Sequence, residues 1–143
     1  MITTDHLNSV TNDFFSRYWN PKNGKVPIWE RSEWDFNGTI PNHDKQGCYA
    51  LLKNDKIIYI GVGISKGSGI YKNHGLGYRL KRYFKVNKNL QLNPNKYLPT
   101  ENWQELTGIL TIGFPNEHFC LASALEIYLV YHLNPTQNKN LKK

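Results

Sequence analysis

The clearest strand pattern in the chain lies in two short segments separated by a turn. Residues 47–53 alternate between two side-chain faces, one of which carries Tyr49. Residues 56–62 are β-branched and aromatic, as is typical of a half-buried strand, and include Tyr59. With residues 54–55 as the turn, the pattern predicts a β-hairpin that carries one tyrosine near each end. Because a lone hairpin is marginally stable in water, we expect a third strand and covering helices elsewhere.

Hydrophobic spacing predicts these covering elements. Residues 4–19 repeat apolar side chains at helical intervals, after Thr4 or Asp5 as a candidate cap. Residues 106–114 are apolar and β-branched and predict the third strand. Helices are expected at residues 78–86 and from Asn116 to about His132, the latter with a buried stripe of Leu121, Leu125, Leu129 and Leu133. The expected fold class is α+β, a small three-stranded antiparallel sheet flanked by helices.

The segments outside these elements are rich in turn residues. Residues 20–46 are expected to be irregular, with Trp29, Trp34 and Phe36 on the core or, alternatively, on a recognition surface. Residues 63–77 contain too many glycines to start a stable helix and predict a flexible loop, and they do not fit a Walker-type phosphate loop. Residues 87–105 also predict a loop.

The length of 143 residues fits one compact domain. We divide it into an N-terminal helical and irregular extension, residues 1–46, packed on a main domain of residues 47–143. No apolar run approaches the ~20 residues that a membrane-spanning helix needs, and the first residues lack a secretory signal pattern. We therefore expect a soluble, cytoplasmic protein.

The two cysteines, Cys48 and Cys120, lie in apolar segments and are expected to be buried thiols in a reducing compartment, with a disulfide as the less favoured alternative. The histidines have no spacing that indicates a zinc site; those considered are His43, His118 and His132.

The net charge of +7 is concentrated in one part of the chain. No acidic residue lies between Asp55 and Glu101, and nine Lys and Arg residues fall there among tyrosines and phenylalanine. Such a region indicates a surface that neutralises phosphates and stacks on bases, although a solvated basic face is the alternative. The candidate DNA contacts are Lys66, Lys72, His74, Lys81, Arg82 and Lys85. For His74, an ordinary surface position is the alternative.

Two tripeptides in the hairpin carry a family resemblance. The chain reads Gly-Cys-Tyr at residues 47–49 and Tyr-Ile-Gly at residues 59–61, and this resembles the GIY-YIG nuclease family, with cysteine at an apolar middle position. The resemblance covers residues 47–138 and implies a three-stranded antiparallel sheet flanked by helices. It also implies an arginine on the next helix with a tyrosine one turn later, which Arg79 and Tyr83 fit. Arg82 is the rival arginine, but a spacing of four favours Arg79.

The resemblance further implies a metal-binding glutamate on the last helix, where Glu126 lies. It also implies a late asparagine, for which Asn138 is the candidate and Asn134 the alternative. The implied activity is a divalent-metal-dependent endonuclease acting on DNA, with one Mg²⁺ or Mn²⁺ per active site.

The chemistry of phosphodiester hydrolysis suits these residue types. Arg79 can hold the phosphate as a permanently charged planar donor, and Glu126 can hold a hard cation that keeps several waters. We expect Tyr49 to be the base, helped by nearby positive charge, because the ordinary tyrosine pKa is about 10. Tyr59 would orient the water or share the proton that Tyr49 takes, and Tyr83 would bond the phosphate. The alternatives are that the hairpin tyrosines are cross-strand packing and that the glutamate is solvated.

The leading hypothesis is an endonuclease that acts on double-stranded DNA, with no membrane partner. The alternative is a DNA- or RNA-binding module that keeps this scaffold without catalysis. The biological role, as a toxin, restriction or mobile-element nuclease, is left open. Cutting both strands would call for a homo-oligomer.

Overall fold

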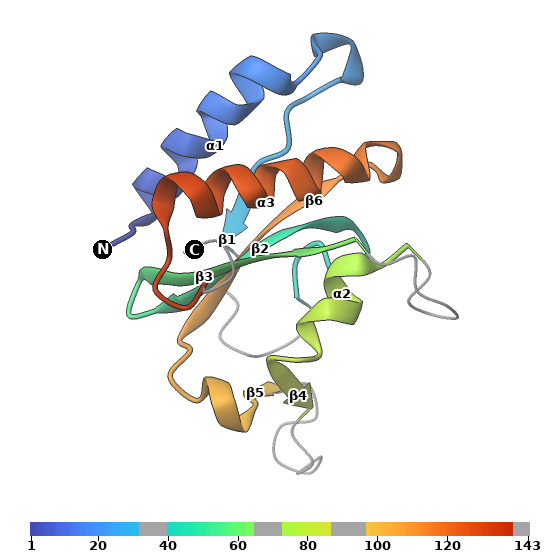
Figure 1. Ribbon diagram of the computed structural model, residues 1–143. Helices are drawn as coiled ribbons and strands as arrows, with labels where there is room; N and C mark the ends of the chain where they lie inside the picture. The colour runs from blue at the N-terminus through green and yellow to red at the C-terminus, as the bar shows by residue number, and fades with distance from the viewer. Residues whose placement is uncertain (32–39, 65–72, 87–96, 139–143) are drawn as a thin grey trace.

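The computed structural model describes residues 1–31, 40–64, 73–86 and 97–138 and shows an α+β protein (Figure 1). The helices in these ranges are α1 (Thr4–Tyr18), α2 (Gly75–Leu80) and α3 (Phe119–Leu133). The strands are β1 (Trp29–Arg31), β2 (Gln46–Lys53), β3 (Lys56–Gly63), β4 (Phe84–Val86), β5 (Tyr97–Pro99) and β6 (Gly108–Phe114). Short 3-10 turns are η1 (Pro21–Asn23), η3 (Glu101–Trp103) and η4 (Asn116–His118). The predicted fold class is confirmed at this level.

Within the described residues the main sheet has four antiparallel strands in the order β1-β6-β2-β3, so the predicted count of three was wrong. The extra strand, β1, comes from the N-terminal extension and places Trp29 opposite Ile112 of β6. The indole nitrogen of Trp29 donates to the Thr11 hydroxyl, 2.8 Å away, which ties this strand to α1. A three-residue strand is too short to show an alternating pattern, which explains why residues 20–46 predicted only irregular chain. Trp34 and Phe36 lie outside the described residues.

The predicted hairpin is confirmed as β2 and β3. Its turn residues, Asn54 and Asp55, have φ angles of 50° and 64°, the left-handed values that a two-residue hairpin turn requires. Alternate residues of β2 enter two separate cores, with Cys48 in one and Tyr49 in the other. The period of two therefore placed both side chains on the correct faces.

Helices cover both faces of the sheet. Figure 1 shows α1 and α3 side by side over one face and α2 against the other. The first core lies between the sheet and α1 and α3, and includes Leu7, Phe14, Ala50, Leu125 and Leu129. The second lies beneath the sheet against α2, and includes Leu51, Leu76, Leu80, Tyr83 and Phe84. Within the described ranges, no helix is long and apolar enough to cross a membrane.

The ends of the long helices differ in part from the expectation. Helix α1 is capped by Thr3, whose hydroxyl accepts from the His6 backbone, so both predicted caps were one or two residues late. Residues 116–118 form η4, and α3 begins only at Phe119, so Asn116 does not cap the helix. The predicted end of α3 is confirmed, because Asn134 has a φ of 50° and stops the helix.

Helix α2 was predicted at the wrong place. It begins at Gly75, inside the segment predicted as a flexible loop, and ends at Leu80. A side chain at Gly75 would strike the backbone of Gly63, so glycine here allows the helix to approach the end of β3 closely. This tertiary contact outweighs the poor helix propensity of glycine. Tyr83 consequently lies in the turn after the helix.

Among the described residues, a second, two-stranded antiparallel sheet replaces the end of the predicted helix 78–86, where β4 lies, and part of the predicted loop 87–105, where β5 lies. Strands β4 and β5 pair Phe84 with Pro99 and Lys85 with Leu98. Each strand has three residues, and the chain between them, residues 87–96, lies outside the described ranges. Figure 1 shows this small sheet beyond α2, away from α1 and α3.

Candidate active site

Three tyrosine rings from different elements meet beneath the main sheet. Tyr49 of β2 stacks on Tyr59 of β3 with ring centroids 6.1 Å apart, and Tyr83 lies 5.4 Å from the Tyr49 ring and 6.1 Å from the Tyr59 ring. The hydroxyls of Tyr49 and Tyr83 are 2.7 Å apart, a buried hydrogen bond. The sequence thus predicted three residues that the fold does bring together, although Tyr83 arrives from a turn.

The glycine of the second tripeptide explains how Tyr49 fits. Gly61 is the strand partner of Tyr49, and a Cβ at this position would collide with the Tyr49 ring and hydroxyl. The ring therefore lies across the backbone of β3, which only glycine permits. Tyr49 is 1% exposed and Tyr59 is half-buried, so the second ring is the more accessible.

Burial and neighbouring hydroxyls set the acidity of this cluster. Burial raises the pKa of Tyr49 well above its ordinary value, and the negative charge and hydrogen bond of Tyr83 raise it further. Burial also raises the pKa of Tyr83, to about 12, but the bond from Tyr49 works in the opposite direction. Either hydroxyl can donate in this bond, and the more deeply buried Tyr49 is the harder of the two to ionise.

Arg79 supplies positive charge at the same place. It projects from α2, and its Nε donates to the carbonyl of Val62 on β3, 3.2 Å away. Its positive charge lowers the pKa of Tyr49, of Tyr83 and of Glu126, although burial raises each of these pKa values more. Arg79 is therefore a positive charge that favours the ionised form of all three groups.

Glu126 lies on α3, the helix that covers the other face of the sheet. Its side chain is half-buried, and burial raises its pKa while Arg79 lowers it. No group of three or more His, Cys, Asp or Glu side chains that could hold a metal occurs among the described residues. A partly exposed single carboxylate suits Mg²⁺, which keeps most of its water ligands, so the residues fit the expected ion.

Asn138 lies where the chain returns to the free edge of β3. Its amide makes two hydrogen bonds to Ile60, accepting from the backbone N–H at 2.9 Å and donating to the carbonyl at 2.7 Å. The Gln137 backbone adds a bond to Ile58. Asn138, rather than the exposed Asn134, thus fixes the end of the chain against the strand that carries Tyr59.

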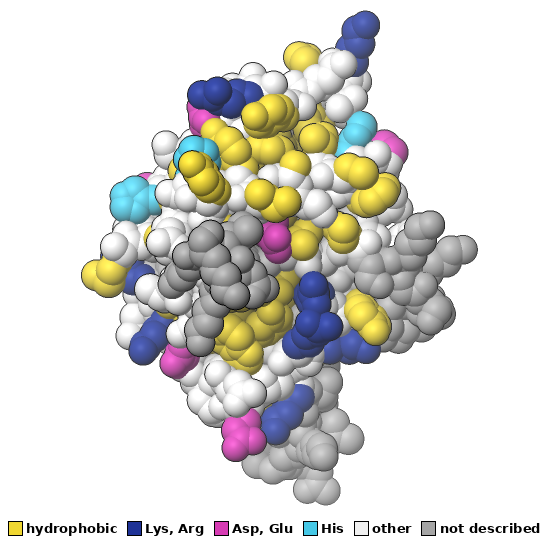
Figure 2. Space-filling model, viewed as in Figure 1, with side chains coloured by type: hydrophobic (Ala, Val, Ile, Leu, Met, Phe, Trp, Pro, Cys, Tyr) yellow, Lys and Arg dark blue, Asp and Glu magenta, His cyan; other side chains and the backbone are white. Residues whose placement is uncertain are grey.

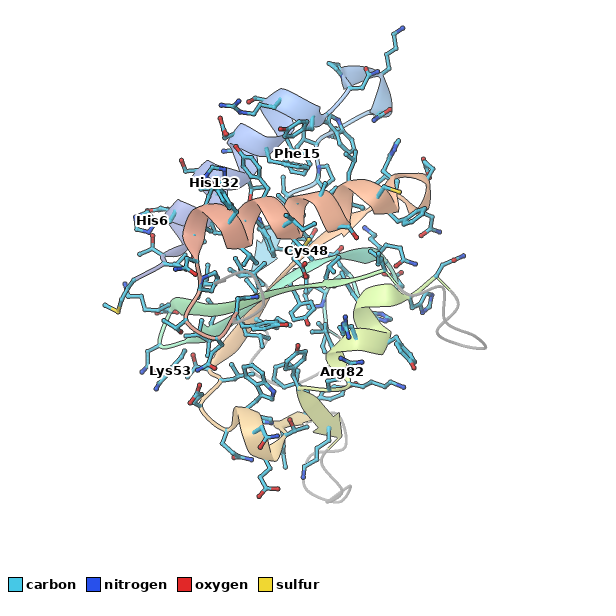
Figure 3. All side chains as sticks on the ribbon, viewed as in Figure 1. His6, Phe15, Cys48, Lys53, Arg82 and His132 are labelled. Atoms are coloured by element: carbon cyan, nitrogen blue, oxygen red, sulfur yellow. The ribbon has the colours of Figure 1, made fainter. Side chains whose placement is uncertain are left out.

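The middle residue of the first tripeptide, Cys48, faces α3. Cys48 is fully buried, its thiol donates to the Ala122 carbonyl 3.1 Å away, and burial raises its pKa. Figure 3 shows it between the sheet and α3. Both cysteines are free thiols, and Cys120 is exposed on the solvent side of α3. The predicted burial of Cys120 was therefore wrong.

The predicted DNA contacts are placed in part. Lys81, Arg82 and Lys85 are exposed, and the ammonium of Lys81 lies 4.6 Å from the centre of the Tyr78 ring. Lys66 and Lys72 lie outside the described residues. Figure 2 shows Lys and Arg side chains beside a hydrophobic patch near α2, and Figure 3 places Arg82 beyond that helix.

His74 directly precedes α2 and is half-buried, and its ring lies 6.1 Å from that of His43. The His43 ring covers part of His74, so His74 is not a fully exposed surface histidine, and its contact with DNA stays a prediction.

Trp103 also belongs to the aromatic cluster, although no sequence pattern predicted its place there. Its ring lies 5.7 Å from Tyr59 and 5.0 Å from Tyr83. The only available signal was an isolated tryptophan in a polar segment predicted as loop, and that pattern does not say which residues it contacts.

Compared with known proteins, the chain matches no family model, no curated protein and no solved structure. The functional assignment therefore depends on the residues and geometry of this site.

Proposed function

We propose that the protein is a divalent-metal-dependent endonuclease that hydrolyses phosphodiester bonds in double-stranded DNA, as its resemblance to the GIY-YIG nucleases implies. One observation carries the proposal. The rings of Tyr49, Tyr59 and Tyr83 meet from three segments of the chain, with the hydroxyls of Tyr49 and Tyr83 hydrogen-bonded. The charge of Arg79 lowers the pKa of Tyr49, Tyr83 and Glu126. A cation, a carboxylate and phenol hydroxyls are the groups that phosphodiester hydrolysis needs.

The side chains divide the reaction between them. Arg79 holds the scissile phosphate, and its bond to the Val62 carbonyl fixes the direction of the planar guanidinium. Tyr49 and Tyr83 share the role of base, with Tyr83 as the hydroxyl that loses its proton and Tyr49 as the donor that stabilises the resulting phenolate. Tyr59, the more accessible ring, orients the attacking water.

Glu126 would hold one Mg²⁺ or Mn²⁺ per active site, whose chemistry is to neutralise phosphate charge and to acidify water. Burial raises the pKa of Glu126, so binding a cation stabilises a carboxylate whose ionised form burial disfavours.

The exposed residues Lys81, Arg82 and Lys85 would contact neighbouring phosphates. A cytoplasmic location is part of the proposal.

Cleavage of an end-labelled DNA duplex tests this function. With Mg²⁺, the wild type should produce 5′-phosphate and 3′-hydroxyl ends, and EDTA should stop the reaction. Arg79→Lys should lose at least ~100-fold in rate because lysine lacks the planar donor, whereas Arg82→Lys, at the exposed rival position, should stay within a few-fold. Binding without cleavage across Mg²⁺, Mn²⁺ and salt series would reject the endonuclease and support the DNA-binding module.

A further inference from the structure

The position of Tyr83 is not fixed by a regular element. The residue lies in the three-residue turn between α2 and β4, and its backbone N–H donates to Leu80 at 3.0 Å. Yet its hydroxyl must meet that of Tyr49 to form the pair. The aromatic cluster therefore needs further contacts that hold this ring.

Residues 100–103 provide such contacts on the backbone. The Thr100 N–H donates to the Tyr83 carbonyl at 2.8 Å, and the Thr100 hydroxyl donates to the Arg82 carbonyl at 3.0 Å. These bonds extend the pairing of β4 with β5 by one residue beyond Phe84 and Pro99. The turn that carries Tyr83 is thereby held against the small sheet.

The same segment contacts the ring of Tyr83. Trp103 follows Thr100 in η3, with its N–H donating to the Thr100 carbonyl at 2.8 Å and its carbonyl accepting from Leu106 at 3.1 Å. Its indole meets Tyr83 edge-on at an interplanar angle of 70° and Tyr59 at 69°. Edge-to-face contacts of this kind favour one relative orientation of the rings.

We propose that Trp103 is a positioning residue of the active site, which holds the rings of Tyr59 and Tyr83 so that their hydroxyls converge with that of Tyr49 and excludes water from one side of the cluster. It acts through the tyrosines and takes no proton itself. This inference rests on the proposed nuclease function for its effect on cleavage. The arrangement of the rings can be tested without cleavage.

The direct test is NMR of protein labelled with ¹³C at the ζ carbon of tyrosine, titrated from pH 8 to 11. The Tyr83 resonance is assigned by its absence from Tyr83→Phe. In the wild type it should barely move, because burial raises the pKa of Tyr83 to about 12. In Trp103→Ala water reaches the ring, so the resonance should titrate within this range, and Trp103→Phe should restore most of the wild-type behaviour.

Trp29→Ala is the matched control, because that tryptophan packs against the other core and hydrogen-bonds to Thr11. Trp29→Ala should lower the free energy of unfolding but leave the pH titration of the Tyr83 resonance as in the wild type. Identical Tyr83 titrations in wild type and Trp103→Ala would overturn the inference. So would the same shift in Trp29→Ala, because a general loosening would then explain it.

Kinetics separates this inference from the proposed function. If the wild type cleaves DNA, Trp103→Ala should lower kcat by roughly 10- to 100-fold with little change in KM, since a small misplacement of reacting groups has effects of that size. Trp103→Phe should recover most of kcat. An unchanged kcat in Trp103→Ala overturns the positioning role alone. Absence of cleavage in the wild type overturns the nuclease, while the titration still decides the arrangement of the rings.

Discussion

Replacing Asn138 by alanine removes two hydrogen bonds from a single strand residue. The Asn138 amide binds both the N–H and the carbonyl of Ile60, and Asn138 is 9% exposed. Ile60 lies on the outer strand of the sheet, so these groups have no strand partner on that side. The substitution therefore removes the side-chain hydrogen bonds that attach residue 138 to β3, the strand that carries Tyr59.

The expected cost follows from these two bonds. Each intramolecular hydrogen bond contributes about 1 kcal/mol net, and a buried group left unpaired costs about 1–3 kcal/mol. Because β3 is an edge strand, water can reach part of the freed Ile60 backbone, which favours the lower values. We expect Asn138→Ala to lower the free energy of unfolding by about 2–4 kcal/mol in total.

Urea unfolding followed by circular dichroism measures this change. With a slope near ~2 kcal/mol per molar urea, the midpoint should fall by about 1–2 M. Gln137→Ala is the control, because that exposed residue bonds Ile58 through its backbone, which alanine keeps. Equal midpoints for Asn138→Ala and Gln137→Ala would mean that the two side-chain hydrogen bonds to Ile60 do not stabilise the fold.

Three further predictions concern the tyrosine cluster and the carboxylate. Gly61→Ala should lower the free energy of unfolding by about 1–3 kcal/mol, because the added Cβ collides with the Tyr49 ring. Gly108→Ala is the control and should change this free energy little, because its Cβ would meet only the Leu52 side chain at 3.4 Å or more. Equal urea midpoints for the two variants would contradict this prediction. Because burial raises the pKa of Glu126, its contribution to stability is present at low pH and lost as pH rises through that pKa, so Glu126→Gln should raise the urea midpoint at pH 7 more than at pH 4. The pKa of Tyr83 is raised to about 12, so the wild type should lose stability between about pH 10 and 12, and Tyr83→Phe should weaken that loss; equal slopes in both proteins would count against it.

The part of the fold that the sequence predicts well depends on local patterns. The hairpin has eight-residue strands on both sides of a left-handed turn, long enough for the period of two to assign Cys48 and Tyr49 to opposite faces. The third strand and the last helix are similarly long, and their existence was predicted correctly. The site residues on these elements, Tyr49, Tyr59 and Glu126, were consequently placed on the right elements.

The elements that escaped prediction are short or depend on tertiary contacts. Strands β1, β4 and β5 have three residues each, which is too few for a periodic signal. Helix α2 begins at Gly75 because the close approach of Gly63 requires glycine there, against its local propensity. Trp103 joins the site through contacts with residues distant in sequence, and no spacing rule encodes such contacts.

If Glu126 holds the metal of a nuclease site, plasmid cleavage should depend on its carboxylate. Supercoiled plasmid is incubated with Mg²⁺ and either the wild type, Glu126→Gln or Glu117→Gln, the last at an exposed glutamate in the turn before the same helix. We expect nicked or linear product with the wild type and Glu117→Gln, and intact supercoiled plasmid with Glu126→Gln. Equal cleavage by the wild type and Glu126→Gln, or none by the wild type, would contradict this expectation.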